Sequence, residues 1–396
     1  MKIINTKTIK TIKILSITFV FALLTSCGGG SDSPVDPVPV NTVYSGEINE
    51  DITWTKDNIY TLDGRVMVTN GVTLTIEAGT VIKGSAGTGE DASCLIIARG
   101  GKIMANGTSA EPIVFTSIAD DITNGTSGFG TGLTIADQGL WGGVLILGNA
   151  DISAESNPLQ IEGIPVSETN GLYGGGTSSN NEDDSGVFEY VQIRHGGSEI
   201  GEGNEINGLT LGGVGSQTTI RNIEIIANLD DGLECFGGSV DVTNCLVWGQ
   251  GDDAFDVDQS YSGEINNFLG ILVNGDQGLE IDGWEGTMQA DFTLSNGTII
   301  GAQGDKNNCG KFKSNASGSV SNVLFTNMKL GSTLTVDAGA TQVLFSNISF
   351  DSGTDLSTTL IDGLGSTNFD ANTNGVGGAN LSLFDGWSCA SYNNAY

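Results

Sequence analysis

Apolar and acidic residues alternate in a phrase that occurs three times near the middle of the chain. Its copies occupy residues 230–235, 252–257 and 276–281, so successive copies begin 22 and 24 residues apart. A repeat of this length with an alternation of period two predicts one β-strand per repeat, stacked on the strand of the next repeat. The same alternation, closed by glycine turns, predicts further strands over 58–64, 74–82, 95–97, 101–105, 112–116 and 141–148.

A second pattern places asparagine in register along the stack. An asparagine with an apolar residue two positions before it recurs every 22 to 29 residues, and in five of six cases an apolar residue follows three positions later. Single asparagines are common turn formers, but six in register predict a stack of side-chain amides at the ~4.8 Å spacing between strands. The six are Asn222, Asn244, Asn267, Asn296, Asn322 and Asn347. This arrangement resembles the asparagine ladder of parallel β-helix proteins.

These patterns predict an all-β chain built as a single-stranded, right-handed parallel β-helix, which is a solenoid. At about 25 residues per turn, residues 44–385 would form roughly a dozen coils. We expect one domain over 43–396, with its exposed edges capped near 43–54 and 384–396. Two polar, glycine-rich stretches near 117–139 and 163–186 are too long for turns. They are expected to be loops that serve either as binding elements or as solvated decoration.

The first 26 residues have the features of a bacterial lipoprotein signal peptide. Four lysines precede an apolar stretch over 14–24, which is too short to span a bilayer, and residues 24–27 (Leu-Thr-Ser-Cys) resemble a lipobox. We therefore expect cleavage before Cys27, lipidation of Cys27 and a flexible tether over 27–42. Ordinary signal cleavage is the alternative. The expected location is the outer membrane, with the lipid as the only membrane contact and with the periplasmic or extracellular face left open.

The chain is strongly acidic. Its net charge of −32 becomes −36 when the four lysines of the signal peptide are removed. Such a surface repels nucleic acid and anionic lipid and attracts divalent cations, which argues against a nucleic-acid partner. The five cysteines that remain after Cys27 match no metal motif. Cys235 and Cys245 stand where other repeats have apolar residues, so we expect them to be small buried side chains.

Taken with the lipobox and both repeats, several phrases resemble a family of right-handed parallel β-helix lipoproteins from Gram-negative bacteria. These phrases are residues 74–84, 112–117, 141–143, 191–197 and 230–234. The resemblance covers nearly all of the mature chain and implies the fold, with the pectate-lyase-like superfamily as the wider relative. A shared fold does not by itself transfer chemistry.

Strand alternation turns Glu234, Asp256 and Glu280 outward in one column, which we call the acidic column. Stacked carboxylates repel one another by ~1 kcal/mol per close pair in water and by ~4 kcal/mol at an effective dielectric constant of 20. Calcium binds carboxylate oxygens in flexible geometry and would relieve this repulsion. We expect one or more Ca²⁺ ions among Asp231, Glu234, Asp253, Asp256, Asp258, Glu280 and Asp282. The alternative is a solvated acidic stripe with raised pKa values.

One coil further along, two lysines follow the acidic residues. If Phe312 points inward, Lys311 lies after Glu280 and Lys313 lies after Asp282. One interpretation is a basic cap that neutralises the acidic column. The other follows polysaccharide lyases of this fold, in which calcium acidifies a proton beside a uronate carboxylate and a lysine or arginine abstracts it. Lys311 would then be the catalytic base.

Other candidate residues are few. Trp248, Tyr261 and Trp284 lie close to the acidic segments in sequence and could stack on sugar rings, or they could simply pack against the coils. The single histidine, His195, is interpreted as structural, because no Ser-His-Asp or zinc constellation can be assembled around it.

Three function classes are compatible with these sequence features. The first is a monomeric, extracytoplasmic protein that binds a polymer, most simply a polysaccharide, along its side with the help of calcium. The second is a lyase or hydrolase that acts on an acidic polysaccharide. The third is a structural or adhesive surface protein. A lysine within reach of a calcium site in an open groove would favour the enzyme, whereas a featureless side would favour adhesion.

Overall fold

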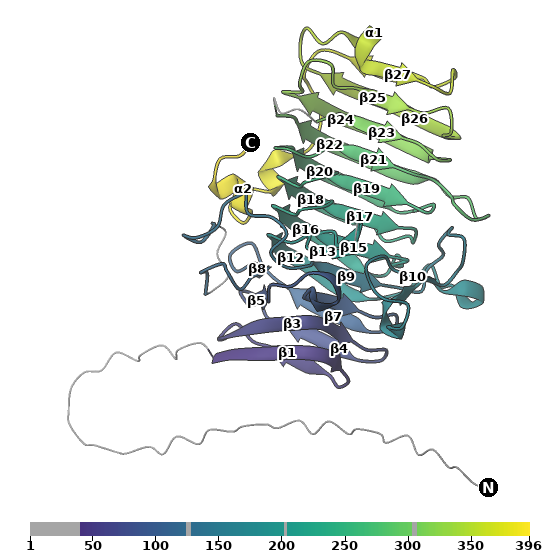
Figure 1. Cartoon of the computed structure of the whole chain (residues 1–396). Helices are drawn as coiled ribbons and strands as arrows, with labels where there is room; N and C mark the ends of the chain where they lie inside the picture. The colour runs from purple at the N-terminus through teal and green to yellow at the C-terminus, as the bar shows by residue number, and fades with distance from the viewer. Residues whose placement is uncertain (1–39, 124–127, 202–203, 303–306) are drawn as a thin grey trace, which may run out of the picture. The chain divides into compact units, whose positions relative to one another are not determined.

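The computed structural model describes residues 40–123, 128–201, 204–302 and 307–396, and its main sheet has twenty-four strands with parallel pairings (Figure 1). The signal peptide, Cys27 and most of the tether lie outside the described residues. Strand β1 (Val40–Ile48) begins inside the segment that was expected to be tether. Residues 40–42, at the C-terminal end of the expected tether, therefore belong to the first strand.

Each coil after residue 186 combines one long strand with one short strand. The long strands are β12 (Gly186–Arg194), β16 (Thr219–Ile226), β18 (Val242–Trp248), β20 (Glu264–Ile271), β22 (Phe292–Ile300), β24 (Ser317–Thr326) and β26 (Gln342–Phe350). The short strands are β15 (Leu209–Gly212), β17 (Leu233–Phe236), β19 (Phe255–Asp258), β21 (Leu279–Ile281), β23 (Gly310–Phe312), β25 (Leu334–Val336) and β27 (Leu360–Asp362). Successive short strands pair with one another and form what we call the short-strand ladder.

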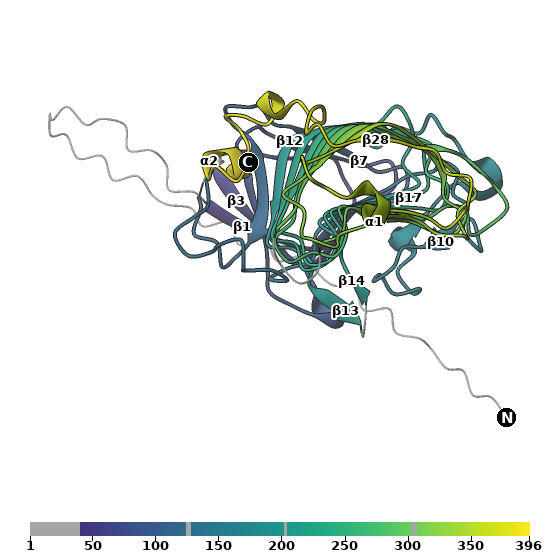
Figure 2. The same cartoon turned by 90° about the horizontal axis from the view of Figure 1, so that it is seen from above.

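The coils at the two ends continue these pairings. The N-terminal coils contain β2 (Ile52–Trp54), β3 (Asn58–Val68), β4 (Thr73–Ile76), β5 (Val81–Gly84), β6 (Cys94–Ile97), β7 (Lys102–Asn106), β8 (Ile113–Ser117) and β9 (Val144–Leu147). Strand β28 (Phe369–Asn372) pairs with β26 and ends the stack, and α1 (Leu356–Thr359) is a single helical turn before β27. Viewed from above, the strands of successive coils superpose (Figure 2). The all-β solenoid predicted from the repeats is confirmed, with almost no helix.

The interior follows the alternation seen in the sequence. Leu233, Phe255 and Leu279 are aligned by strand pairing and are all fully buried. Phe255 also meets Phe268 of β20 edge to face, with ring centroids 5.1 Å apart. Cys235 is likewise a buried free thiol, as predicted. Stacks of apolar side chains inside the coils therefore supply the main stabilisation of the fold through the hydrophobic effect.

The asparagine ladder is present at the bend of the long strands. Asn222, Asn244 and Asn267 have φ of 55°, 57° and 55°, so each occupies the left-handed region, which asparagine tolerates better than most residues. The Asn244 amide donates to Asn222 Oδ1 at 2.8 Å, and the Asn267 amide donates to Asn244 Oδ1 at 2.9 Å. A second run joins Asn347, Asn322 and Asn296 at 3.0 and 2.7 Å. The predicted amide stack is confirmed, in two runs.

Replacing Asn244 with alanine should lower the free energy of unfolding by about 2–3 kcal/mol. The substitution removes two amide hydrogen bonds of about 1 kcal/mol each and places alanine in the left-handed region. Asn394 is exposed and also left-handed, with φ of 52°. Asn394→Ala therefore measures the cost of placing alanine in the left-handed region without the loss of ladder hydrogen bonds. Urea denaturation should show a clearly larger loss for Asn244→Ala. Equal losses for the two variants would mean that the ladder bonds contribute nothing.

Two long segments leave the coils, close to the expected loops at 117–139 and 163–186. The first runs from residue 118 to 143, between β8 and β9, with a gap in the description at 124–127. The second, which we call the covering segment, spans residues 149–175 and holds the hairpin of β10 (Leu159–Gln160) and β11 (Leu172–Tyr173). Several of its apolar side chains, among them Ile161, Ile164 and Tyr173, are buried against the outside of the coils. The second loop is therefore packed onto the solenoid rather than solvated.

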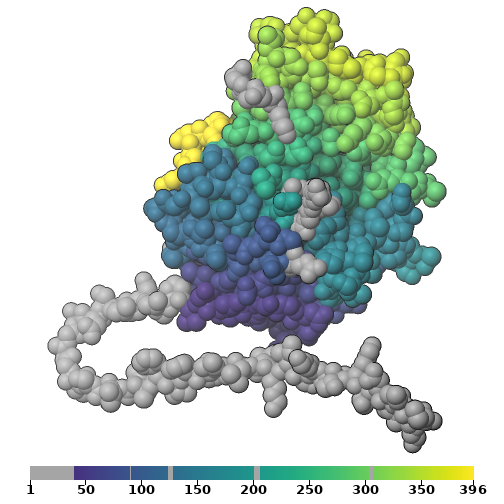
Figure 3. All heavy atoms as spheres, viewed as in Figure 1, coloured from purple at the N-terminus to yellow at the C-terminus, as the bar shows by residue number. Residues whose placement is uncertain are grey.

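The C-terminus does not cap the last coil, contrary to the sequence-based expectation. Residues 373–396, which we call the C-terminal strap, run back along the side of the solenoid and end in α2 (Cys389–Tyr392) beside the middle coils (Figure 1). The backbone N–H of Asn380 donates to Asn267 Oδ1 at 2.6 Å, and Gln192 donates to the carbonyl of Trp387 at 2.5 Å. In Figure 3 the yellow atoms of the strap adjoin the blue atoms of the first loop.

The strap covers an apolar stripe on the long strands. Phe384 and Trp387 pack against Leu246, Leu269 and Ile271, so burial of this stripe explains why the strap lies on the side of the stack. Among the described residues, no helix has the length and apolar character needed to cross a membrane.

Candidate functional site

The outward positions of the short-strand ladder form one continuous column along the solenoid. Strand pairing aligns, in order, Met67, Ile96, Leu145, Thr210, Glu234, Asp256, Glu280, Lys311 and Thr335. The column is therefore apolar at its N-terminal end, acidic in the middle and basic beyond that. The covering segment buries the apolar end, where Ile161 and Tyr173 pack with Ile96 and Leu145.

The acidic column brings carboxylate oxygens together as the sequence predicted. Oxygens of Asp231, Glu234 and Asp256 lie within 4.8 Å of one another, and we call these residues the inner group. Oxygens of Asp253, Asp256 and Glu280 do the same and form the outer group. Asp256 belongs to both groups. A third set, Asp230, Asp231 and Asp252, lies at the adjoining turn.

The two groups differ in exposure. Asp231, Glu234 and Asp256 are only 7, 5 and 8% exposed. Glu280, in contrast, is half-buried and opens the outer group to solvent. The expected alternative of a solvated acidic stripe therefore does not describe the inner group. A ligand of the outer group can meet a polymer, whereas a ligand of the inner group cannot.

Burial and mutual repulsion raise the pKa of these carboxyls. Burial, followed by the charge of Glu280, raises the pKa of Asp253 to about 8. The pKa values of Asp231, Glu234 and Asp256 lie well above their usual range, first because of burial and then because of neighbouring carboxylates. Without a counter-ion, the protein bears the cost of keeping these groups ionised or must protonate them.

Some of the carboxylates also have backbone partners. Asp231 accepts a hydrogen bond from the N–H of Asp253 at 2.7 Å, and Asp253 accepts one from the N–H of Gln277 at 2.6 Å. Each bond joins one coil to the next, so these two residues hold the turns together. Asp256 Oδ1 is buried and has no hydrogen-bond partner among the described residues, so it remains available to a cation.

Asp258 and Asp282 form a neighbouring column rather than part of the two groups. Each lies two residues after a member of the acidic column, Asp258 after Asp256 and Asp282 after Glu280. The backbone N–H of Asp282 donates to the carbonyl of Val257. Burial, followed by the charge of Asp282, raises the pKa of Asp258 to about 8. The sequence pattern placed both residues among the cation ligands, and the three carboxylate groupings of the described residues do not include them.

The two lysines beyond the acidic column have different partners. Lys313 Nζ lies 2.8 Å from Glu280 and 3.3 Å from Asp282. Burial opposes its charge, but the hydrogen bond to Glu280 and both carboxylates outweigh burial and raise the pKa of Lys313. Lys311 sits directly above Glu280 in register, as predicted, and its Nζ lies 3.7 Å from Asp337. Lys313 is thus a neutralising cap, and Lys311 stays a candidate base.

The three candidate aromatic residues do not form one platform. Tyr261 is 1% exposed and its hydroxyl donates to the carbonyl of Val240 at 2.6 Å, which corrects the expectation that it faces a sugar. Trp248 ends a long strand on another face and packs against Phe129, with ring centroids 5.6 Å apart. Trp284 is half-buried just after β21, so it alone stays a candidate for stacking near the acidic column.

His195 is buried beneath the first loop, in keeping with a structural role. Its Nδ1 lies 2.6 Å from the carbonyl of Asp137, and burial lowers its pKa. Neutral imidazole at this position ties the loop to the end of β12.

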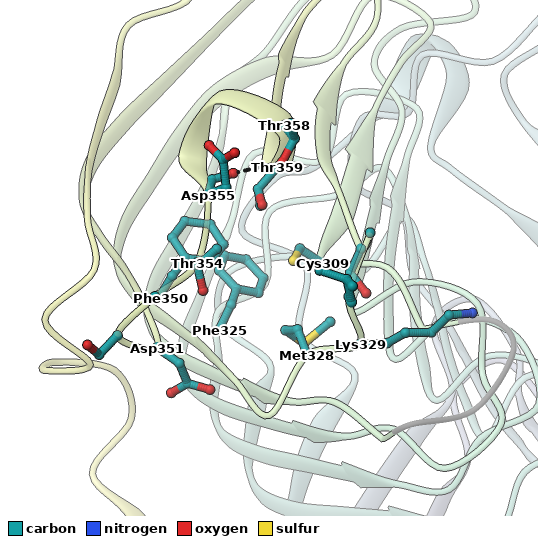
Figure 4. A pocket seen from close by; sticks show the side chains of 15 residues that line it. Cys309, Phe325, Met328, Lys329, Phe350, Asp351, Thr354, Asp355, Thr358 and Thr359 are labelled. Atoms are coloured by element: carbon teal, nitrogen blue, oxygen red, sulfur yellow. Dashed lines mark hydrogen bonds between the residues drawn. The ribbon is translucent and has the colours of Figure 1, made fainter.

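Two of the cavities lined by the described residues lie beside the covering segment and at the last coils. One, of about 350 Å³, is lined by Glu155, Leu159 and Glu285 beside the hairpin of the covering segment. The other, of about 390 Å³, lies at the last coils, where Cys309, Phe325 and Phe350 face Asp355 of the turn before α1 (Figure 4). Glu285, which lines the first cavity, directly follows Trp284 in sequence.

Asn207 and Glu162 were missed by sequence reasoning. The Asn207 amide donates to Glu234 and lies 3.5 Å from a carboxylate oxygen of Glu162 in the covering segment. Glu162 belongs to no repeat, and only the packing of the covering segment brings it to the acidic column. Asn207 stands at the repeat position that Asp231 fills one coil later, because Leu209 pairs with Leu233, and a search for acidic residues passes over its amide.

A family model described as a pectate-lyase like beta helix domain matches residues 46–380. The matched range runs from β1 into the C-terminal strap and therefore includes the whole acidic column. No curated protein and no solved structure matches the chain. The match confirms the type of solenoid that the resemblance implied, and at the level of function it suggests a role related to polysaccharide.

Proposed function

We propose, on the premise that this chain belongs to the family of pectate-lyase-like β-helix domains, that it binds an acidic polysaccharide through calcium held by the outer group. In this proposal the protein is a monomer anchored to the outer membrane by a lipid on Cys27. The observation that carries the proposal is the alignment of Asp253, Asp256 and Glu280, with oxygens within 4.8 Å and one residue open to solvent.

Calcium suits this group because its donors are all carboxylate oxygens. Ca²⁺ prefers oxygen ligands, takes several at once and accepts irregular geometry. Asp256 Oδ1 supplies a buried oxygen with no other partner among the described residues. Glu280 supplies a ligand at the surface, where a further oxygen from outside can complete the coordination.

The charge of the protein supports a bridging role for the cation. With a net charge of −36 after removal of the signal peptide lysines, the mature chain repels a polyanion over its whole surface. Calcium at the outer group offsets two of its three negative charges, and Lys311 lies directly above Glu280. A uronate carboxylate can then be shared between the cation and the lysine. Binding should therefore depend strictly on the cation.

The test uses mature protein and immobilised polyuronate, with calcium or with chelator. Retention should require calcium, and Glu280→Gln should weaken it about tenfold, because one charged ligand of about 1.4 kcal/mol is lost. Glu182 is an exposed acid away from the column, so Glu182→Gln is the matched control and should bind like wild type. Equal retention with chelator and with calcium would rule out the proposal.

The same incubation distinguishes binding from cleavage. The position of Lys311 over Glu280 favours a lyase as the second candidate, with its amine as the base that removes the proton beside the uronate carboxylate. A lyase releases unsaturated oligosaccharides that absorb in the ultraviolet. Loss of these products in Lys311→Ala, with retention of the polymer, would identify the enzyme.

A further inference from the structure

The inner group lies where no polymer can reach it. Its three carboxylates are at least nine-tenths buried, yet they stand within 4.8 Å of one another. Such a cluster must be protonated or meet a counter-charge, and within the described residues Lys313 meets the acidic column only at Glu280. A counter-charge for the inner group therefore has to come from something small enough to enter the protein.

The covering segment contributes a further acid to this place. Ile161 and Ile164 of the segment are buried against the outside of the coils, and Glu162 lies between them in sequence at the surface. Its carboxylate oxygen is 3.5 Å from the Asn207 amide nitrogen, and its charge contributes to the raised pKa of Glu234. An acid of the covering segment thus faces acids of the solenoid across Asn207.

Two buried oxygens at this junction have no partner among the described residues. They are Asn207 Oδ1, from a side chain that is 1% exposed, and Asp256 Oδ1. A buried polar atom without a partner costs about 1–3 kcal/mol. The Asn207 amide nitrogen faces Glu234 and Glu162, and a half-turn of the amide would put its oxygen, an atom that calcium takes as a ligand, in that place. The Asn207 oxygen thus indicates a ligand independently of the acidic residues.

We propose that Glu234, Asp256, Asn207 and Glu162 hold a second calcium ion, which fastens the covering segment to the solenoid. Asp231 completes the carboxylate set from the turn below. The inference rests on the proposal that the acidic column holds calcium, because Asp256 is shared with the outer group. Its role is different, since this ion joins two parts of the chain and touches no polymer.

The ends of the covering segment are already fixed without a cation. Ser153 donates its backbone N–H to the carbonyl of Gln259, and Tyr173 donates its hydroxyl to the Gln259 side chain at 2.9 Å. The stretch between these anchors contains Glu162. Calcium should therefore act mainly on the residues between 154 and 172, and that is where its effect can be measured.

Hydrogen exchange of the full mature chain, with calcium alone as the probe, tests this inference. Calcium should slow amide exchange roughly tenfold between residues 154 and 172 in the wild-type protein, and Glu162→Gln should abolish the slowing. Glu162 is exposed and glutamine has the same shape, so the variant should fold. Glu155→Gln, in the same segment and also exposed, is the matched control and should behave like wild type.

The outcome separates this inference from the proposed function. Glu162→Gln should keep calcium-dependent retention on polyuronate, because the outer group is intact. Calcium-independent exchange of the segment in a wild-type protein that still binds polyuronate with calcium would overturn the second site alone. Failure of the protein to bind calcium at all would overturn both proposals.

Discussion

Replacing Asp256 with asparagine should raise the melting temperature of the calcium-free protein and lower that of the calcium-loaded protein. Without calcium, Asp256 is a buried carboxyl that faces the charges of Asp258 and Asp231, and the variant removes its cost of ionisation. Keeping a buried carboxylate ionised costs several kcal/mol in proteins. With calcium, the same substitution removes a ligand that the two groups share.

Thermal melts with saturating calcium and with chelator measure this reversal. A change of several degrees in each direction is expected, because 1 kcal/mol shifts the midpoint of a large domain by roughly 2–4 °C. Asp57 is an exposed acid in the N-terminal coils, and Asp57→Asn should leave both midpoints near those of wild type. If Asp256→Asn shifts the midpoint in the same direction under both conditions, the column does not bind calcium.

Acidification from pH 8 to pH 5 should stabilise the folded protein through Glu224, the carboxyl that contacts the C-terminal strap. This buried carboxylate accepts hydrogen bonds from the N–H groups of Cys389 and Ala390 at 2.7 and 2.8 Å. Burial outweighs these bonds and raises the pKa of Glu224 from 4.5 to about 7. Because the folded state binds the proton of Glu224 more tightly than the unfolded state does, the contribution of Glu224 to stability is largest below pH 4.5. This contribution is lost as the pH rises through 7.

Glu224→Gln isolates this contribution. Wild type should lose roughly 2–3 kcal/mol more than the variant in free energy of unfolding between pH 5 and pH 8, given a shift of about 2.5 pKa units. Urea denaturation in excess calcium holds the proposed cation sites in one state while the pH changes. Glu50, an exposed acid, supplies the control Glu50→Gln, which should retain the wild-type pH dependence. Identical pH profiles for Glu224→Gln and wild type would refute this role of Glu224 in holding the strap.

The acidic column could be predicted from sequence because its register is determined by the interior. Leu233, Phe255 and Leu279 must all point inward, and a slip of one residue would expose them. That requirement alone places Glu234 above Asp256. The asparagine ladder follows for the same reason, since each Asn stands at a fixed distance from an inward apolar side chain.

The sequence could not predict the contacts made by the covering segment and the strap, because neither segment belongs to the repeats. Glu162 of the covering segment meets Asn207 of the coils only through tertiary packing. The strap lies on the side of the stack because Phe384 and Trp387 fit an apolar stripe that only strand pairing creates. No local pattern reports either contact.

The sequence also failed to predict which lysine contacts Glu280. Register placed Lys311 over Glu280, and the structure agrees. The ammonium that reaches Glu280, however, belongs to Lys313, because a lysine side chain is long enough to cross to the neighbouring column. Strand pairing determines where a backbone position lies. It does not determine which neighbouring carboxylate the charged end of a long side chain contacts.

Calorimetric titration of calcium into the chelator-treated mature protein tests the cation site of the acidic column most directly. We expect saturable binding of two ions in wild type, one ion in Glu162→Gln, and no high-affinity binding in Asp256→Asn. Wild-type protein that gives no saturable heat, or Asp256→Asn that binds calcium as wild type does, would contradict the proposed cation site.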